Sequence, residues 1–256
     1  MTQNSNIFDP AFDEILRHVN KEATALKIEF YLAGAVARDY HLNKLANYTP
    51  SRKTADIDIA VMVTSEVEFS KLKESLIQTG NFEEHNEPIK LIYKKSIELD
   101  LLPFGDIEKE GITTLTKPKI FVLDMPGFAI LNKYAEQVQW SDEVNARVCS
   151  IEGIVLLKLI ANNDRPERTK DLIDIQQIIL IYFEAFSDDV YEHHFDLMEK
   201  YNTSDRDYIQ QVSAHVIGRK LKKVLNSEED LMKRIIHILK DDKDLYWKNI
   251  LSGLTE

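Results

Sequence analysis

The chain has few of the residues that cross-link a protein or anchor it in a membrane. It contains one cysteine, Cys149, so no disulfide can form within it, and a reducing compartment is the simplest expectation. No apolar run approaches the ~20 residues of a membrane span, and the first ten residues lack the pattern of a signal peptide. We therefore expect a cytoplasmic protein with no membrane partner.

Negative charge exceeds positive charge. The chain has 32 Lys and Arg against 43 Asp and Glu, and its formal net charge is −11. This balance weighs against a broad nucleic-acid surface, which normally needs a basic face. The basic run Arg219–Lys223 is expected to be a solvated helix face, although a nucleic-acid contact there stays open.

Apolar periodicity predicts a first part of mixed strands and helices and a helical second part. Strands are expected over Ile28–Leu32, Ala55–Val63, Ile89–Tyr93, Ile97–Leu102, Ile120–Val122 and Val144–Val148. Helices are expected over Pro10–Lys27, Gly34–Leu45, Ser65–Gln78, Phe128–Val138, Glu152–Asn162, Thr169–Phe186, Val190–Tyr201, Asp207–Leu225, Glu228–Leu239 and Leu245–Leu251. Polar loops are expected over Asn47–Ala55 and Pro103–Pro118. The change near Ser150 predicts two domains, residues 1–150 and 151–256.

Two acidic residues stand on the otherwise apolar strand Ala55–Val63. Because side chains alternate along a strand, Asp56 and Asp58 project from the same face. Neighbouring carboxylates repel each other, and they suit Mg²⁺, which prefers a few hard oxygens. Asp100, on a second apolar strand, would complete a two-metal site. The alternative is a structural acid pair bridged to Arg38, Arg52 or Lys53.

A second pattern suits a phosphate group. Gly34 stands between a predicted strand and a predicted helix, where a glycine lets the backbone approach a ligand. The helix start at Gly34-Ala35 offers free N–H groups, and Arg38, about one turn further on, adds a charged donor. Taken alone, the same pattern is also typical of a plain turn from strand to helix.

A third pattern opens the helical part. Lys158 stands in a very apolar predicted helix, so its ammonium needs a partner, and its compact charge suits a triphosphate. Pro166 breaks this helix, and Thr169 begins the next one, with Asp171 in its first turn. The alternative is a packing corner held by structural salt bridges.

Together these residues resemble the nucleotidyltransferases of the polymerase-beta superfamily. There a helix-leading glycine pair or Gly-Ser precedes an Asp-x-Asp, and a later strand supplies the third carboxylate, as in Gly34-Ala35, Asp56-x-Asp58 and Asp100. The segment from Lys158 to Asp174 is similar to the AbiEii-type branch of abortive-infection and toxin–antitoxin enzymes. The resemblance covers roughly residues 28–182. It departs at Ala35, which lacks the hydroxyl that a serine there would donate to a phosphate.

The resemblance implies an α+β protein with a mixed-sheet nucleotidyltransferase domain followed by an all-helical domain. It implies Mg²⁺-dependent (or Mn²⁺-dependent) transfer of a nucleoside monophosphate from an NTP such as ATP to a hydroxyl, with release of pyrophosphate. Asp56, Asp58 and Asp100 would bind the metals, and Asp100 would help to deprotonate the acceptor. The nucleotide-binding residues would be Gly34, Ala35, Arg38, Lys158, Arg168 and Asp171, with Asp171 orienting Lys158 or Arg168.

The acceptor stays open between a tRNA end, a protein hydroxyl and a small molecule such as an aminoglycoside. A toxin-like protein would also have an antitoxin as a partner. The second hypothesis is a non-catalytic nucleotide-binding or partner-binding module of the same fold, which Ala35 favours. Three carboxylates on apolar strands weigh against it, because buried acids are costly to retain without a cation.

Overall fold

The computed structural model describes residues 8–43, 56–141, 144–241 and 246–256. The predicted loop Asn47–Ala55, with Arg52 and Lys53, and the first part of the predicted helix Leu245–Leu251 therefore lie outside the described residues. The chain divides into two compact units, one formed by Met1–Asp39 and Thr49–Ser150, the other by Tyr40–Tyr48 and Ile151–Glu256. In the described parts of the chain, no helix is long and apolar enough to cross a membrane.

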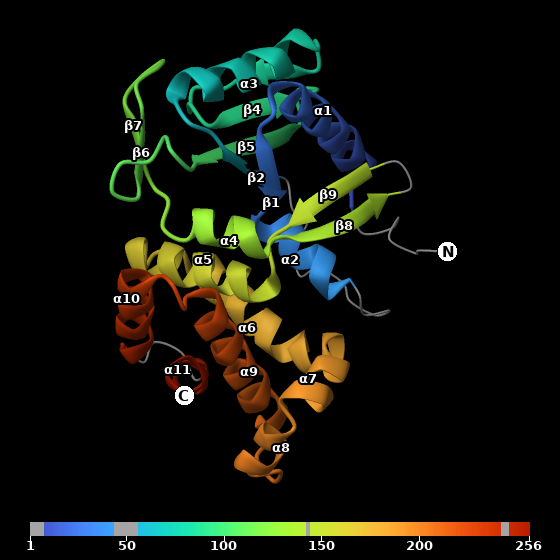
Figure 1. Ribbon diagram of the computed structural model, residues 1–256. Coiled ribbons are helices and arrows are strands. Elements are labelled where there is room, and N and C mark those ends of the chain that lie inside the picture. Colours follow the sequence, from blue (N-terminus) through green and yellow to red (C-terminus); the bar gives the residue numbers. More distant parts are fainter. Residues whose placement is uncertain (1–7, 44–55, 142–143, 242–245) are drawn as a thin grey trace. The chain divides into compact units, whose positions relative to one another are not determined.

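The first unit is built on a seven-stranded mixed sheet with the strand order β3-β4-β5-β2-β1-β9-β8 (Figure 1). The pairs β2–β5 and β1–β9 are parallel, and the other neighbours are antiparallel. Strands β6 and β7 form a separate antiparallel pair. The bounds are β1 Glu29–Leu32, β2 Asp56–Met62, β3 Phe82–Glu84, β4 Lys90–Tyr93, β5 Ile97–Phe104, β6 Ile112–Leu115, β7 Phe121–Asp124, β8 Glu136–Ser141 and β9 Val144–Val148.

The helices α1 (Pro10–Leu26) and α3 (Glu66–Gln78) pack beside each other in this unit (Figure 1). Helix α1 begins as its sequence predicts, because Asp9 accepts a hydrogen bond from the N–H of Ala11 at 2.9 Å. Tyr93 on β4 donates a hydrogen bond to Glu14 of α1. Since side chains alternate along a strand, Lys90 of β4 lies on the face opposite Tyr93, away from α1. One face of the sheet is therefore core, and the other is available for polar side chains.

The second unit contains the helices that follow Ser150. Their bounds are α5 Ile151–Asp164, α6 Thr169–Ala185, α7 Ser187–His193, α8 Asp196–Lys200, α9 Tyr208–Val224, α10 Glu229–Lys240 and α11 Trp247–Thr255. Helices α9 and α11 approach each other very closely, at two glycines. A Cβ at Gly218 would lie 2.1 Å from the carbonyl oxygen of Ile250, and one at Gly253 would lie 2.1 Å from that of His215. Only glycine permits this backbone contact at these two positions.

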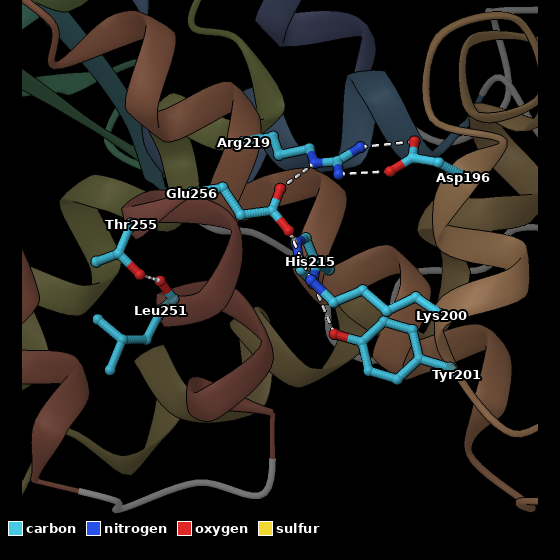
Figure 2. A network of polar contacts seen from close by, with 8 residues as sticks. All are labelled: Asp196, Lys200, Tyr201, His215, Arg219, Leu251, Thr255 and Glu256. Carbon is cyan, nitrogen blue, oxygen red and sulfur yellow. Dashed lines mark hydrogen bonds and ion pairs between the residues drawn. The ribbon is translucent and has the colours of Figure 1, made fainter.

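A network of polar contacts joins α8 and α9 to Glu256 (Figure 2). The Glu256 carboxylate accepts hydrogen bonds from Arg219 Nε and Lys200 Nζ, both at 2.6 Å, and lies 2.8 Å from His215 Nε2. Burial alone would raise the pKa of Glu256, but the hydrogen bonds from Arg219 and Lys200 lower this pKa to about 2. Arg219 also forms a paired interaction with Asp196, at 2.9 and 2.6 Å.

This network corrects the prediction that the run Arg219–Lys223 is a solvated helix face. Arg219 and Lys220 are half-buried, and Lys220 Nζ lies 2.7 Å from Asp189 Oδ2. Leu221 is buried, and only the last two lysines of the run are exposed. Acidic neighbours therefore neutralise the first two charges of the run, which weakens the case for a nucleic-acid contact there.

Three expectations of secondary structure differ from the structure, and one strand was not expected. The segment Pro103–Pro118 is not a continuous loop, because β6 lies within it, buried at Thr113, whose hydroxyl donates to the carbonyl oxygen of Pro103 at 3.0 Å. The predicted helix Phe128–Val138 ends at Tyr134 (α4, Phe128–Tyr134), since the residues after it form β8 and pair with β9. The predicted helix Val190–Tyr201 is divided into α7 and α8, and β3 was not predicted at all.

The close approach of α9 and α11 generates a prediction for Gly218→Ala. The added methyl group cannot fit against the carbonyl of Ile250, so we expect the free energy of unfolding to fall by about 1–3 kcal/mol. Urea denaturation measures this change. Ser252→Ala, at an exposed position of α11, is the matched control and should change the stability little. Equal stability of Gly218→Ala and the wild type would contradict the packing described.

Candidate active site

The acidic residues of β2 and β5 form one cluster on the sheet. Parallel pairing places Asp56 beside Glu98 and Asp58 beside Asp100. All four side chains are half-buried, whereas their neighbours Ile57 and Leu99 are completely buried. Alternation along both strands therefore directs four carboxylates to the face opposite α1.

Lys90 adds a positive charge to this cluster. It is the register partner of Asp100 on β4, and its ammonium donates a hydrogen bond to Glu98. Its Nζ lies 3.6 Å from Asp100 Oδ1. Burial, together with the negative charges of Asp56 and Glu98, outweighs Lys90 and raises the pKa of Asp100 to about 6.

The turn from β1 into α2 (Gly34–Leu42) lies directly against Asp58. The N–H of Ala33 donates to the backbone carbonyl of Asp58 at 2.9 Å. Gly34 has a φ of +63°, and a Cβ on it would lie 1.9 Å from Asp58 Oδ2. A side chain at position 34 would thus occupy the place of the Asp58 carboxylate. Gly34 and the half-buried Ala35 bring the start of α2 to the acidic cluster.

Arg38 lies further along α2 and is fully buried. Its Nε donates to Asp39 Oδ1 at 2.8 Å, and its Nη2 lies 2.7 Å from the same oxygen. The adjacent acid thus compensates the guanidinium. A contact between Arg38 and a phosphate stays a prediction. In such a contact the guanidinium would bind the phosphate and Asp39 at the same time.

Lys158 forms a second charged cluster, within the helical unit. Its Nζ lies 2.6 Å from Asp174 Oδ2 and 3.5 Å from Asp171 Oδ1. Asp171 Oδ2 in turn lies 3.1 Å from Arg168 Nε. Lys158, Asp171 and Asp174 are all buried. Asp171 therefore forms ion pairs with both Lys158 and Arg168.

Comparison with known protein families shows which family the chain belongs to. The model of the family described as "Nucleotidyl transferase AbiEii toxin, Type IV TA system" matches residues 15–255. The chain belongs to the AbiEii family. It is therefore a nucleotidyltransferase, and the match extends the resemblance, which reached residue 182, through the remaining helices. No curated protein matches the chain in a sequence comparison.

Several solved structures are distantly similar to this AbiEii family member. The lincosamide antibiotic adenylyltransferase LnuA is 18% identical, with 56% of this chain and 84% of that chain covered and a TM-score of 0.35. A nucleotidyltransferase-like protein from Paracoccidioides brasiliensis is 16% identical over 86% and 89% of the two chains, with a TM-score of 0.39. A CCA-adding enzyme in its apo form is 13% identical over 95% and 68%, with a TM-score of 0.34.

The fold of AbiEii enzymes implies a divalent cation, and the acidic cluster suits one in two respects. Asp56, Asp58 and Asp100 offer carboxylate oxygens, the donors that Mg²⁺ prefers. Asp100 Oδ1 is buried and accepts no hydrogen bond, and its ion pair with Lys90 is long, at 3.6 Å, so a divalent cation bound there would stabilise it further. Within the described ranges, no three or more acidic, histidine or cysteine side chains are already gathered as a metal-ligand group. Donor type and charge therefore suit the ion, although the side chains are not yet gathered into a ligand group in the described residues.

The structure brings together the predicted residues Gly34, Asp56, Asp58 and Asp100 in one unit. It places Lys158, Arg168 and Asp171 together in the helical unit. Sequence reasoning missed Lys90 and gave Glu98 no role. The signal was present, because the turn Lys94-Lys95-Ser96 joins β4 to β5 as a hairpin, and counting back across it pairs Lys90 with Asp100.

The raised pKa of Asp100 predicts a pH-dependent stability of the metal-free protein. The usual pKa of an aspartate is 3.8, against about 6 for Asp100 in the folded protein. Below pH 4 the carboxyl is protonated in both the folded and the unfolded state, so it does not affect stability. Above pH 6 it is ionised in both states, and the full cost of burying its charge lowers the free energy of unfolding. Asp100→Asn removes this cost. We expect it to raise the free energy of unfolding at pH 7 by about 2 kcal/mol. The difference should disappear below pH 4 in urea denaturation series; a pH-independent difference would contradict the assigned cause.

The buried position of Lys158 predicts a large effect of Lys158→Met. The substitution leaves Asp171 and Asp174 buried without their common cation, which typically costs about 3–5 kcal/mol. Urea denaturation without nucleotide measures this loss. Lys170→Met, at an exposed position of the same segment, is the control. Similar stabilities of the two variants would show that Lys158 does not hold α5 and α6 together.

Proposed function

We propose that the protein transfers a nucleoside monophosphate from an NTP such as ATP to a hydroxyl and releases pyrophosphate. In this reaction the acceptor oxygen forms a bond to the α-phosphorus while the bond to the pyrophosphate oxygen breaks. Asp56, Asp58 and Asp100 would hold Mg²⁺ or Mn²⁺. The bound ion would neutralise charge on the phosphates and lower the pKa of the attacking hydroxyl.

The observation that carries this proposal is the pairing of β2 with β5. It gathers hard-oxygen donors on one face of the sheet, and Gly34 brings the start of α2 against one of them, Asp58. A helix start offers free N–H groups to phosphate oxygens, so a phosphate held there would lie next to the carboxylates. Asp100 is proposed as the proton acceptor because it lies on the same face of the sheet as the other acids, paired with Asp58.

The other nucleotide-binding roles are proposed on chemistry alone. Ala35 offers its backbone N–H but no hydroxyl. Arg38, Lys158 and Arg168 carry positive charges next to acids that orient them, and Asp171 orients the last two. An oriented cation loses less side-chain entropy when it binds a phosphate.

The acceptor is proposed to be a hydroxyl of a tRNA end, a protein or a small molecule such as an aminoglycoside. As an AbiEii family member, the protein would act as the toxin of a pair, with an antitoxin as its partner. Incubation with labelled NTPs and with total RNA, total protein or aminoglycosides distinguishes the three acceptor classes, because the label moves into one of them.

The decisive test compares Asp58→Asn with Asp205→Asn. Asp205 belongs to the Asp-x-Asp pair Asp205-Arg206-Asp207, which lies in a turn, and Asp205 itself is exposed. We expect Asp58→Asn to reduce label transfer by at least about a thousandfold, because the substitution removes a charge from the metal site. Asp205→Asn should transfer label as the wild type does.

Growth of cells expressing each variant gives a second readout. Wild type and Asp205→Asn should slow growth, and Asp58→Asn should not. If the wild-type protein binds an NTP tightly but releases no pyrophosphate with any acceptor, the non-catalytic module favoured by Ala35 replaces this proposal.

A further inference from the structure

Lys90 holds a position between two of the clustered acids. Its ammonium donates a hydrogen bond to Glu98, and its Nζ lies 3.6 Å from Asp100 Oδ1. The Lys90 side chain is 13% exposed, against 47% for Glu98 and 18% for Asp100. Lys90 is half-buried and lies among the carboxylates on the face of the sheet opposite α1. It is therefore part of the acidic cluster and not an isolated surface charge.

The register explains why a cation is needed there. Four carboxylates face the same side of β2 and β5, and like charges at neighbouring positions of a sheet destabilise it. Of the two acids that contact Lys90, Asp100 is less exposed than Glu98, so water solvates its charge less. A positive charge from the next strand, β4, reduces the repulsion without any bound ion.

The two contacts of Lys90 are unequal. The contact with Glu98 is a hydrogen bond, whereas the contact with Asp100 is an ion pair at 3.6 Å without a hydrogen bond. Asp100 Oδ1 therefore accepts no hydrogen bond from Lys90, and its contact with the ammonium is the weaker of the two. Glu98, which no sequence pattern marked as functional, fixes the lysine beside this oxygen.

We propose that Lys90 is a built-in counter-ion, anchored on Glu98, that compensates Asp100 in the metal-free protein and yields Asp100 to a divalent cation. The inference rests on the proposed metal-binding role of Asp100. Lys90 is then a positioning residue, because it acts through Asp100 and not on the nucleotide. Glu98 sets the balance by keeping the ammonium from binding Asp100 fully.

Opposite effects of two substitutions on metal affinity test this role. The probe is Mn²⁺ alone, titrated into the protein without nucleotide, with free Mn²⁺ measured by electron paramagnetic resonance. Lys90→Met removes the competing charge, so we expect the Kd for Mn²⁺ to fall at least threefold. Glu98→Gln releases the ammonium to Asp100, so the Kd should rise at least threefold. Lys90→Arg keeps the charge and should bind Mn²⁺ as the wild type does.

A double variant isolates the route of the Glu98 effect. In the Lys90→Met background, Glu98→Gln should change the Kd less than it does in the wild type, because the lysine through which it acts is absent. Equal effects in both backgrounds would mean that Glu98 acts on the metal directly, which overturns the anchoring role.

Stability supplies a second readout. Metal-free Lys90→Met should melt at a lower temperature than the wild type, and excess Mn²⁺ should restore more of its stability than it adds to the wild type. A Kd unchanged or raised in Lys90→Met overturns the proposal. If Lys90→Met does not fold, Lys90→Gln, which also removes the charge, takes its place in the Mn²⁺ titration and in the double variant.

Asp100→Asn separates this inference from the proposed function. If Asp100→Asn binds Mn²⁺ as tightly as the wild type, Asp100 is not a metal ligand, and the proposed metal site fails. If Asp100→Asn weakens binding while Lys90→Met does not tighten it, the metal site stands and only the role of Lys90 fails.

Discussion

The parallel pairing of β2 with β5 is the constraint on which the candidate site depends. Without it, Asp56-x-Asp58 would be two acids on one strand, and Asp100 would be a third acid about forty residues away. The register aligns Asp58 with Asp100 and Asp56 with Glu98. A shift of one residue would turn one acid pair into the core and expose its apolar neighbours, so burial of those neighbours protects the register.

The same alternation makes one face of the sheet apolar and the other acidic. Ile57 and Leu99 are completely buried on the face that packs against helices, while the acids occupy the other face. Like charges collected in this way need compensation. Within the described residues, Lys90 supplies part of it from β4, and Gly34 leaves room for the carboxylate of Asp58. The apolar face stabilises the fold and fixes the register that the site needs. On the acidic face, the charges proposed for function lower the stability.

The helical unit shows how a motif can serve both function and packing. Lys158 was expected to bind phosphate, with a structural salt bridge as the alternative. The structure shows the salt bridges to Asp171 and Asp174, both buried. A buried lysine that pairs with two buried acids links α5 to α6 whatever its role toward a nucleotide. The proposed role and the structural one are therefore not exclusive.

Most of the strands and helices, and the three acids proposed for catalysis, could be predicted from the sequence, because alternation and helical periodicity are local properties of the chain. The division after Tyr134 into α4 and β8 could not, since pairing with β9 decides it. Lys90 and Glu98 gained their roles only in the sheet, where hairpin and parallel registers bring charges from three strands together. The sequence by itself determined which acids lie on apolar strands and which glycine precedes a helix. Only the tertiary structure decided which charges meet, because Coulomb interactions depend on distance in space and not along the chain.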